Sequence, residues 1–248
     1  MTETNGKDQQ NSTNILPPGY TSLTPLLAEK HQDLRYTPLP TYEFAKSLHA
    51  VPLVADEFPR AQLSFPIVFT KNLPRLPVGM LSAQSGAHEY VADGKWKDGE
   101  YVPAYLRRYP FALVKESMES DRMLLCADLT APQFAESNDG MPLFDGQDPS
   151  DASKQVIEFC RHYEASVQRT RQLVDELEKL QVFEDSSVKI QKGEKSARVE
   201  GFALVSEKLL RELGDTELAS LARRGVIGLV AAHQFSINQF SGVMKDSL

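Results

Sequence analysis

The segment from Tyr101 to Phe111 holds the densest group of side chains that could do chemistry. It reads YVPAYLRRYPF and places two adjacent arginines, Arg107 and Arg108, among tyrosines. A guanidinium can clamp a carboxylate or phosphate through paired hydrogen bonds, and aromatic rings can wall the pocket around it. The segment therefore predicts a site for a small anionic ligand or a peptide end. We expect a strand over residues 101–114.

On such a strand, alternate side chains face opposite sides, so Tyr105, Arg107 and Tyr109 share one face and Arg108 follows the other. If the second face lies in the core, Arg108 needs a carboxylate partner, because an unpaired buried charge is very costly. Asp128, in the next predicted strand, is the candidate. A structural ion pair produces the same residue pattern as a ligand site, and which arginine faces inward stays open.

Other side chains are weaker candidates. Trp96 could wall the pocket, although packing in a core or hairpin is its commoner use. His233 follows an apolar run, where we expect a buried, hydrogen-bonded imidazole. In an alternative hypothesis the protein is an enzyme, a hydrolase or transferase acting on peptides, with Asp128, His233 or His88 as acid/base groups. The histidines lack metal-site spacing and no cofactor motif occurs, so we expect no metal and no cofactor.

The elements that must position these residues fall into two halves. Before Asp148, short β-branched and aromatic runs alternate with prolines and turn residues, and Asp93-Gly94 is typical of a tight hairpin. No crossover of helix length separates the runs, which favours an antiparallel or mixed sheet. The predicted strands lie at 42–49, 63–70, 78–82, 89–91, 96–101, 101–114 and 122–129.

A long helix is predicted after Asp148-Pro149, a typical helix start. Seven residues recur at alternating intervals of four and three positions, which places them in one stripe along the helix. They are Val156, Cys160, Tyr163, Val167, Thr170, Val174 and Leu177. The stripe favours packing on the protein's own sheet. The heptad spacing leaves open a homodimer through the 151–180 helix, although Cys160 and Thr170 are poor residues for a coiled-coil seam.

The remaining segments predict a hairpin, two short helices, a strand and a last helix. Lys192-Gly193-Glu194 separates the two hairpin strands, and polar caps with glycine stops mark the helices. The ranges are 188–191 and 198–204 for the hairpin, 206–214 and 215–225 for the helices, 226–231 for the strand and 236–244 for the last helix. The predicted class is α+β, with a sheet built mainly from the N-terminal half and covered by the long helix and shorter C-terminal helices.

Composition narrows the function. The 248 residues are 41% hydrophobic, ample for one continuous core, and the net charge of −7 repels nucleic-acid phosphates and anionic lipids. We therefore expect no nucleic-acid partner, no membrane span and one domain over residues 21–248 after a disordered tail at 1–20. Residues 1–14 lack the pattern of a secretory signal, and Cys126 and Cys160 fit buried free thiols, which together predict a cytoplasmic protein.

Several blocks of sequence together resemble the SapC family of bacterial proteins, named from a surface-array (S-layer) locus. They are VPLVADEFPRAQLSFPIVFT at 51–70, DGKWKDGEYVPAYLRRYPFALV at 93–114, LLCADL at 124–129, GMPLF at 140–144, GFALVSEKLLREL at 201–213 and GVIGLVAAHQFS at 225–236. The resemblance reaches from Leu23 onward and departs at 87–90 and in the loop 131–140. It carries over no catalytic residues, and its most distinctive feature is Arg107-Arg108-Tyr109.

The resemblance implies an accessory protein of surface-layer or outer-membrane-uptake systems. The leading hypothesis is a cytoplasmic accessory protein that binds a peptide, a protein partner or a small anionic ligand through Tyr105, Arg107 and Tyr109. A second alternative, besides the enzyme, is a structural surface-layer component.

Overall fold

The fold was analysed in a computed structural model. Backbone and side chains are described for residues 16–39, 41–83, 88–117, 119–134, 139–189 and 198–243, and the backbone alone for 190–192 and 195–197.

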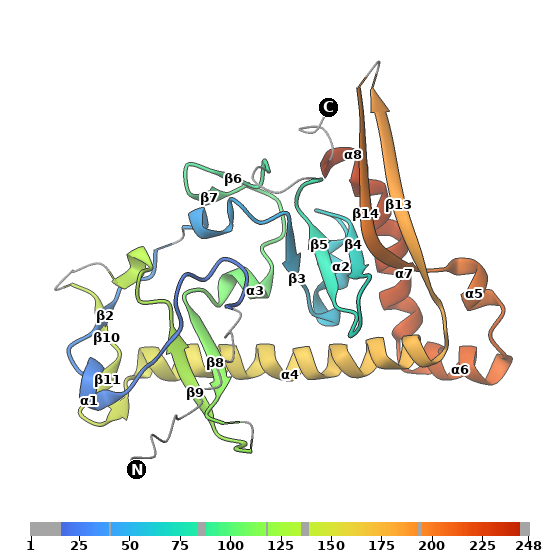
Figure 1. The fold of residues 1–248 in the computed structure, drawn as a ribbon. Coiled ribbons are helices and arrows are strands. Elements are labelled where there is room, and N and C mark those ends of the chain that lie inside the picture. Colours follow the sequence, from blue (N-terminus) through green and yellow to red (C-terminus); the bar gives the residue numbers. More distant parts are fainter. Residues whose placement is uncertain are drawn as a thin grey trace, which may run out of the picture.

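Two antiparallel sheets lie along one long helix, α4 (Asp151–Lys179; Figure 1). With 29 residues, α4 is about 44 Å long, enough to pass both sheets. The smaller sheet has the order β1-β9-β8, from Thr24–Pro25, Met123–Ala127 and Phe111–Lys115. The larger has the order β13-β14-β4-β5-β3, from Phe183–Lys192, Lys195–Val205, Ile67–Thr70, Pro77–Met80 and Ala50–Pro52.

Short elements connect and cover these sheets. Three two-stranded ribbons join β2 (Arg35–Tyr36) to β10 (Met141–Pro142), β6 (Val91–Ala92) to β7 (Lys95–Trp96), and β11 (Phe144–Asp145) to β12 (Asp148–Pro149). The helices before α4 are α1 (Ala28–His31), η1 (Glu43–Ala45), η2 (Ala55–Glu57), α2 (Phe58–Ala61), α3 (Ala104–Arg107) and η3 (Pro132–Phe134). Those after it are α5 (Glu207–Arg211), α6 (Asp215–Arg223), α7 (Val226–Ser236), η4 (Ile237–Gln239) and α8 (Phe240–Val243).

The α+β class, the antiparallel pairing and the long helix are confirmed. Most strands of the two larger sheets precede Asp148, as predicted, but the two longest, β13 and β14, follow it. The hairpin at Asp93-Gly94 is present between β6 and β7, with both turn residues at positive φ. Such a turn matches the twist of the strands it joins.

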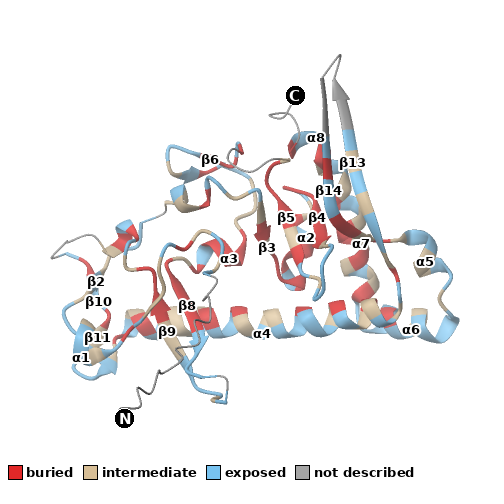
Figure 2. Cartoon of the chain, viewed as in Figure 1, coloured by how far each residue is buried: buried red, intermediate tan, exposed pale blue. Residues whose placement is uncertain are grey.

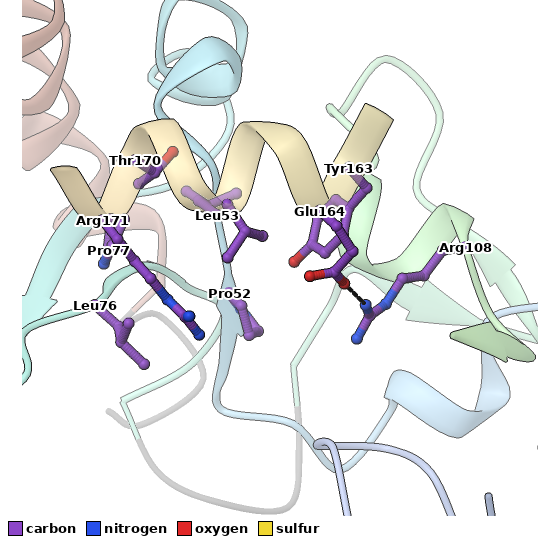
Figure 3. A pocket seen from close by; sticks show the side chains of 10 residues that line it. Pro52, Leu53, Leu76, Pro77, Arg108, Tyr163, Glu164, Thr170 and Arg171 are labelled. Carbon is purple, nitrogen blue, oxygen red and sulfur yellow. Dashed lines mark hydrogen bonds and ion pairs between the residues drawn. The ribbon is translucent and has the colours of Figure 1, made fainter. Parts of the chain in front are cut away.

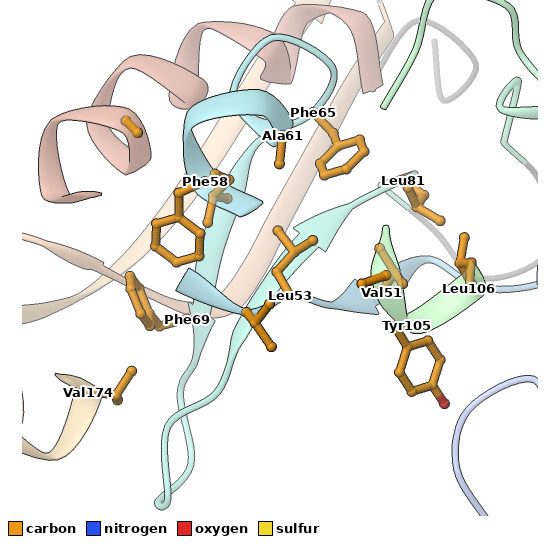
Figure 4. Close-up of a cluster of buried hydrophobic side chains, with 14 of the residues drawn as sticks. Val51, Leu53, Phe58, Ala61, Phe65, Phe69, Leu81, Tyr105, Leu106 and Val174 are labelled. Atoms are coloured by element: carbon orange, nitrogen blue, oxygen red, sulfur yellow. The ribbon is translucent and has the colours of Figure 1, made fainter. Parts of the chain in front are cut away.

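The apolar stripe of α4 faces the interior. Five of its seven predicted residues are buried, and Val156 and Val167 are half-buried. The largest cluster of buried side chains joins α4, the larger sheet, α2 and α7 and includes Val51, Phe65 and Val174 (Figures 2 and 4). Because the stripe packs within its own chain, a homodimer through the 151–180 helix would have to use the polar side of α4.

The helix begins slightly later than predicted. Ser150, rather than Asp148, is the N-cap: its Oγ accepts from the Ser153 backbone N–H at 3.2 Å and donates to the Pro142 carbonyl at 2.7 Å. Asp148 and Pro149 instead form β12. A serine hydroxyl can satisfy a free amide of the first turn while it ties the helix start to a neighbouring loop.

The prediction of one strand over 101–114 is wrong. Pro103 is the N-cap of α3, a single turn over Ala104–Arg107, and the strand β8 begins only at Phe111. Ala104, Leu106 and Arg107 are good helix formers, and a proline just before the first turn does not interrupt helical hydrogen bonds. The alternation of strand faces therefore does not apply to Tyr105, Arg107 and Tyr109.

The predicted strand at 226–231 is also wrong, because the segment is the first part of α7. An apolar run can be a buried helix or a buried strand, and period alone does not separate them. Here α7 packs against α2, α6, β4 and β14, so apolar residues are needed on several sides. The predicted strand at 42–49 is replaced by η1, and β3 begins at Ala50. The predicted helix at 236–244 forms as η4 and α8 over its described part.

The predicted tail at 1–20 extends too far. Residues 1–15 lie outside the described chain, but Tyr20 is buried and its hydroxyl donates to the Phe111 carbonyl at 2.8 Å. The ordered body therefore begins before residue 21.

Alanine substitutions at two glycines should change the free energy of unfolding in opposite directions. A Cβ on Gly79 of β5 would lie 2.5 Å from Cε2 of the buried Phe65, whereas a Cβ on Gly228 of α7 would meet nothing within 4 Å. We expect Gly79→Ala to lower the free energy of unfolding by about 1–3 kcal/mol through overpacking. Gly228→Ala should raise it by up to about 1 kcal/mol through helix propensity. Urea unfolding measures both, and equal effects of the two substitutions would contradict this packing.

Candidate functional site

The end of α3 directs its two arginines into different surroundings. Consecutive residues on a helix point about 100° apart, so Arg107 and Arg108 cannot share one contact surface. Arg108 is 8% exposed, whereas Arg107 is exposed. The question that the sequence left open is therefore settled: Arg108 is the inward arginine.

Arg108 lies among three tyrosine rings. Its Cζ is 4.7 Å from the ring centroids of Tyr105 and Tyr163 and 5.8 Å from that of Tyr20. Its Nη1 donates to Glu164 Oε1 at 3.1 Å. Burial opposes the guanidinium charge, but the tyrosines and Glu164 outweigh it and raise the pKa of Arg108. Ring faces and one carboxylate thus hold a buried cation in place.

Asp128 was predicted to pair with Arg108, and this is wrong, because Glu164 of α4 takes that role. Asp128 is buried and accepts from the Thr21 backbone N–H at 2.7 Å, from Ser22 Oγ at 3.0 Å and from Thr130 Oγ1 at 2.7 Å. Burial alone would raise its pKa, but these hydrogen bonds lower it to about 2. Asp128 therefore anchors the segment that carries Tyr20 into the arginine cluster.

Arg108 also lines a pocket between α4 and one edge of the larger sheet (Figure 3). We call it the α4 pocket; its volume is about 200 Å³. Its lining comes from β3, the start of β5, α4 and the residue after α3. The residues are Pro52, Leu53, Leu76, Pro77, Arg108, Tyr163, Glu164, Val167, Thr170 and Arg171.

Arg107 lines a pocket of about 200 Å³, separate from the α4 pocket, which we call the Arg107 pocket. It also lines a second cavity, of about 470 Å³, together with Arg60, Glu100 and Tyr101. Segments 36–39 and 41–42, the end of α3 and η3 surround the Arg107 pocket. Its residues are Tyr36, Pro38, Leu39, Thr41, Tyr42, Leu106, Arg107, Tyr109 and Gln133.

Arg107 has aromatic neighbours and no carboxylate within ion-pair distance among the described residues. Its Nη2 donates to the Tyr101 hydroxyl at 3.4 Å, and its Cζ lies 5.5 Å from the ring centroid of Phe159. Tyr109 stacks on Phe44 at a centroid distance of 3.7 Å, which fixes the ring at the pocket wall. Burial raises the pKa of Tyr42, although the charge of Arg107 opposes this shift.

Gln133 closes the Arg107 pocket from η3. Its side chain is buried, and its Nε2 donates to the Leu39 carbonyl at 3.5 Å. Its Oε1 is buried and receives no hydrogen bond from any donor in the described chain. Buried polar atoms are nearly always paired in native proteins, so a buried acceptor without a donor requires an explanation.

The other predicted residues do not join these pockets. Tyr105 is buried beside Arg108, and its hydroxyl donates to the Pro18 carbonyl at 2.7 Å. Trp96 is buried against Tyr90, with ring centroids 5.5 Å apart, and lines neither arginine pocket. Of the predicted face of Tyr105, Arg107 and Tyr109, only the last two share a pocket.

The three acid/base candidates have separate partners. His233 accepts from the Val205 backbone N–H at Nε2 and contacts the Ile67 carbonyl through Nδ1 at 2.7 Å. Burial lowers the pKa of His233 to about 4, which keeps the ring neutral. His88 contacts the Ala45 carbonyl at 2.9 Å. No hydrogen bond between His88, Asp128 and His233 occurs in the described structure. Within the same residues, no group of three or more His, Cys, Asp or Glu side chains is placed to hold a metal ion.

Sequence reasoning missed Glu164 and Gln133. Glu164 lies beside Tyr163 and four residues after Cys160, at the border of the apolar stripe of α4. An acidic residue at that border could have been weighed as a partner for Arg108. Gln133 lies in a loop without a motif, and nothing in the sequence marks it.

The match of this chain to a protein family covers nearly its whole length. The SapC family model matches residues 26–243, which include both arginine pockets and the whole of α4. The chain belongs to the SapC family. No curated protein and no solved structure matches it. Within the described part of this SapC protein, no helix has both the length and the apolar composition needed to cross a membrane.

The buried imidazole predicts a pH dependence of stability. The folded pKa of His233 is about 4, below the ordinary 6.5, so the unfolded chain binds a proton between these values that the folded chain does not. The contribution of the neutral His233 side chain to the free energy of unfolding is therefore fully present above pH 6.5. It decreases by up to about 3 kcal/mol as the pH falls to 4.

We expect His233→Gln to flatten the dependence of unfolding free energy on pH in this window, relative to the wild type. His162→Gln is the control, because His162 is exposed on α4 and contacts only Glu158 among charged neighbours. Urea unfolding from pH 7 to pH 4 measures the slopes. Identical slopes for wild type and His233→Gln would show that the imidazole does not stay neutral.

Proposed function

We propose that this SapC-family protein is a binding protein and that its Arg107 pocket receives the carboxyl end of a peptide. The observation that carries the proposal is the pairing, in one pocket, of a cation and a buried acceptor that both lack a partner among the described residues: Arg107 has no carboxylate within ion-pair distance, and Gln133 Oε1 has no donor. A peptide end supplies both missing groups, since its terminal carboxylate lies next to a backbone N–H.

The charge of Arg107 supports the anionic part of the ligand. Its guanidinium makes a hydrogen bond with the Tyr101 hydroxyl and lies over Phe159. Tyr101 in turn donates to the buried Glu57 at 2.9 Å, so this carboxylate is reached only through the hydroxyl and forms no ion pair with Arg107. The guanidinium has a planar set of donors that fits a carboxylate in paired hydrogen bonds. A carboxylate entering the pocket would therefore gain a charge-assisted contact without displacing an internal ion pair.

Gln133 supports the second group of the ligand, a backbone N–H that donates a hydrogen bond. Leaving a buried acceptor unpaired costs about 1–3 kcal/mol, and a ligand N–H that reaches Oε1 removes this penalty. The Nε2 contact with Leu39 identifies which end of the amide is the nitrogen, since the carbonyl of Leu39 can only accept. Oε1 is therefore an acceptor placed for a ligand donor.

The walls support a ligand of about one residue. Tyr36, Tyr42 and Tyr109 contribute rings, and Leu39 and Leu106 contribute apolar surface. Tyrosine pairs an apolar ring with a polar hydroxyl, which suits a ligand with both kinds of surface. The cavity of about 200 Å³ suits the last residue of a peptide better than a longer segment.

For the cellular role, we propose a cytoplasmic accessory protein linked to surface-layer or outer-membrane-uptake systems. Membership of the SapC family supports the link, and two buried free thiols, Cys126 and Cys160, are compatible with a reducing compartment. The binding role is preferred over a peptide hydrolase or transferase, because Asp128, His233 and His88 have separate hydrogen-bond partners. A structural surface-layer component and a homodimer through the polar side of α4 stay predictions that cell fractionation and light scattering would test.

Peptide binding should depend on Arg107. We expect N-acetylated tripeptides with a free carboxyl end to bind and their amidated forms not to bind, as measured by isothermal titration calorimetry. Arg107→Gln should weaken binding by about tenfold or more, because a charge-assisted hydrogen bond contributes about 1.5–3 kcal/mol.

Arg60→Gln is the matched control. Arg60 is exposed, lies over the Tyr101 ring at 5.6 Å and shares the 470 Å³ cavity with Arg107, but it does not line the Arg107 pocket. Its variant should bind like the wild type. Equal binding of free and amidated peptides, or equal losses in the two variants, would contradict the proposed function.

Gln133 gives a second prediction, in which stability and binding change in opposite directions. Gln133→Met replaces the unpaired amide by an apolar side chain of similar length. We expect the free protein to gain on the order of 1 kcal/mol of unfolding free energy, because a buried unpaired acceptor disappears. Peptide affinity should fall in the same variant. Thermal unfolding with and without peptide measures both, and a variant that is destabilised yet still binds would refute this role of Oε1.

A further inference from the structure

The α4 pocket is a second site, independent of the proposed function. We propose that it binds a short aliphatic monocarboxylate, with the chain between α4 and the edge of the larger sheet and the carboxylate between Arg171 and Arg108.

The walls are apolar on both sides. Pro52 of β3, Leu53 just after it, and Leu76 and Pro77 at the start of β5 form one side (Figure 3), and Val167 of α4 also lines the pocket. Burying a methylene group contributes about 0.8 kcal/mol. An unbranched chain would therefore be stabilised by this space, whereas a ligand made only of charged groups would not.

The charge of the pocket is unbalanced. Two guanidiniums, from Arg108 and Arg171, line it with a single carboxylate, Glu164. Glu164 bonds Arg108, whereas Arg171 is exposed and forms no ion pair with any described residue. Burial raises the pKa of Glu164, and the charges of Arg108 and Arg171 oppose this shift. One further negative charge would balance the two guanidiniums together with Glu164, which points to a ligand with a single negative charge.

One hydrogen-bond donor of Arg108 also lacks an acceptor among the described residues. Arg108 uses Nη1 for Glu164, but its buried Nε has no acceptor in the described chain. The rings of Tyr105 and Tyr163 hold the guanidinium in place, so it needs little rearrangement to meet a ligand. A ligand carboxylate beside Glu164 would supply the acceptor that Arg108 lacks.

The polar group deeper in the pocket is already satisfied. Thr170 donates its hydroxyl to the Ser166 carbonyl at 2.7 Å and accepts from the Ala55 backbone N–H at 2.8 Å. It therefore offers little to a hydroxyl on the ligand chain. We expect plain aliphatic acids to bind in preference to hydroxy acids of the same length, because a buried ligand hydroxyl without a partner is unfavourable.

Calorimetry with sodium hexanoate tests the site, with hexanamide and 6-hydroxyhexanoate as matched ligands. Hexanoate should bind, and both matched ligands should bind at least about tenfold more weakly. Arg171→Gln should weaken hexanoate binding by a similar factor. Arg161→Gln is the control, because Arg161 is exposed on the same helix but does not line the pocket, and it should leave the affinity unchanged.

Two outcomes would overturn the proposal: absence of hexanoate binding, or equal affinities in Arg171→Gln and Arg161→Gln. Arg107→Gln separates this site from the proposed function, because it should leave hexanoate affinity unchanged while it weakens peptide binding. Loss of hexanoate binding in Arg107→Gln would mean that the acid occupies the Arg107 pocket, and the α4 site would then be rejected.

Discussion

The buried charge of Arg108 is the constraint on which the arrangement around α3 depends. A guanidinium removed from water is tolerated only where other groups compensate for its lost hydration. Here the groups come from distant parts of the chain: Tyr20 from the N-terminal segment, Tyr105 from α3, and Tyr163 and Glu164 from α4. Asp128 in turn holds the segment of Tyr20 through Thr21 and Ser22. One cation thus joins the small sheet, α3 and the long helix.

This constraint also determines what Arg107 can do. Because α3 is a single helical turn, fixing Arg108 in the interior sends its neighbour outward, toward Tyr101 and Phe159. One arginine is held mainly by internal contacts, and the other forms no ion pair with a carboxylate of the described residues. The division explains why a pair of identical residues serves a structural role and a candidate binding role at once.

The predictions that succeeded rested on local signals. The stripe of α4 repeats over many turns, so its inward face could be read from spacing alone, and Asp93-Gly94 encodes its turn in two residues. The predictions that failed depended on surroundings. The run at 226–231 is a helix because it packs on several neighbours, and 101–114 contains a helical turn because Pro103 and Ala104 favour one where alternation suggested a strand.

The sequence by itself determined the α+β class, the long helix and the family. Only the tertiary structure decided which arginine is buried, that Glu164 rather than Asp128 is its partner, and that Gln133 lines the same pocket as Arg107. The physical reason is the range of the interactions. Helix spacing and turn preference act between near neighbours in the chain, whereas ion pairs and pocket walls join residues far apart in it, and no local pattern records those encounters.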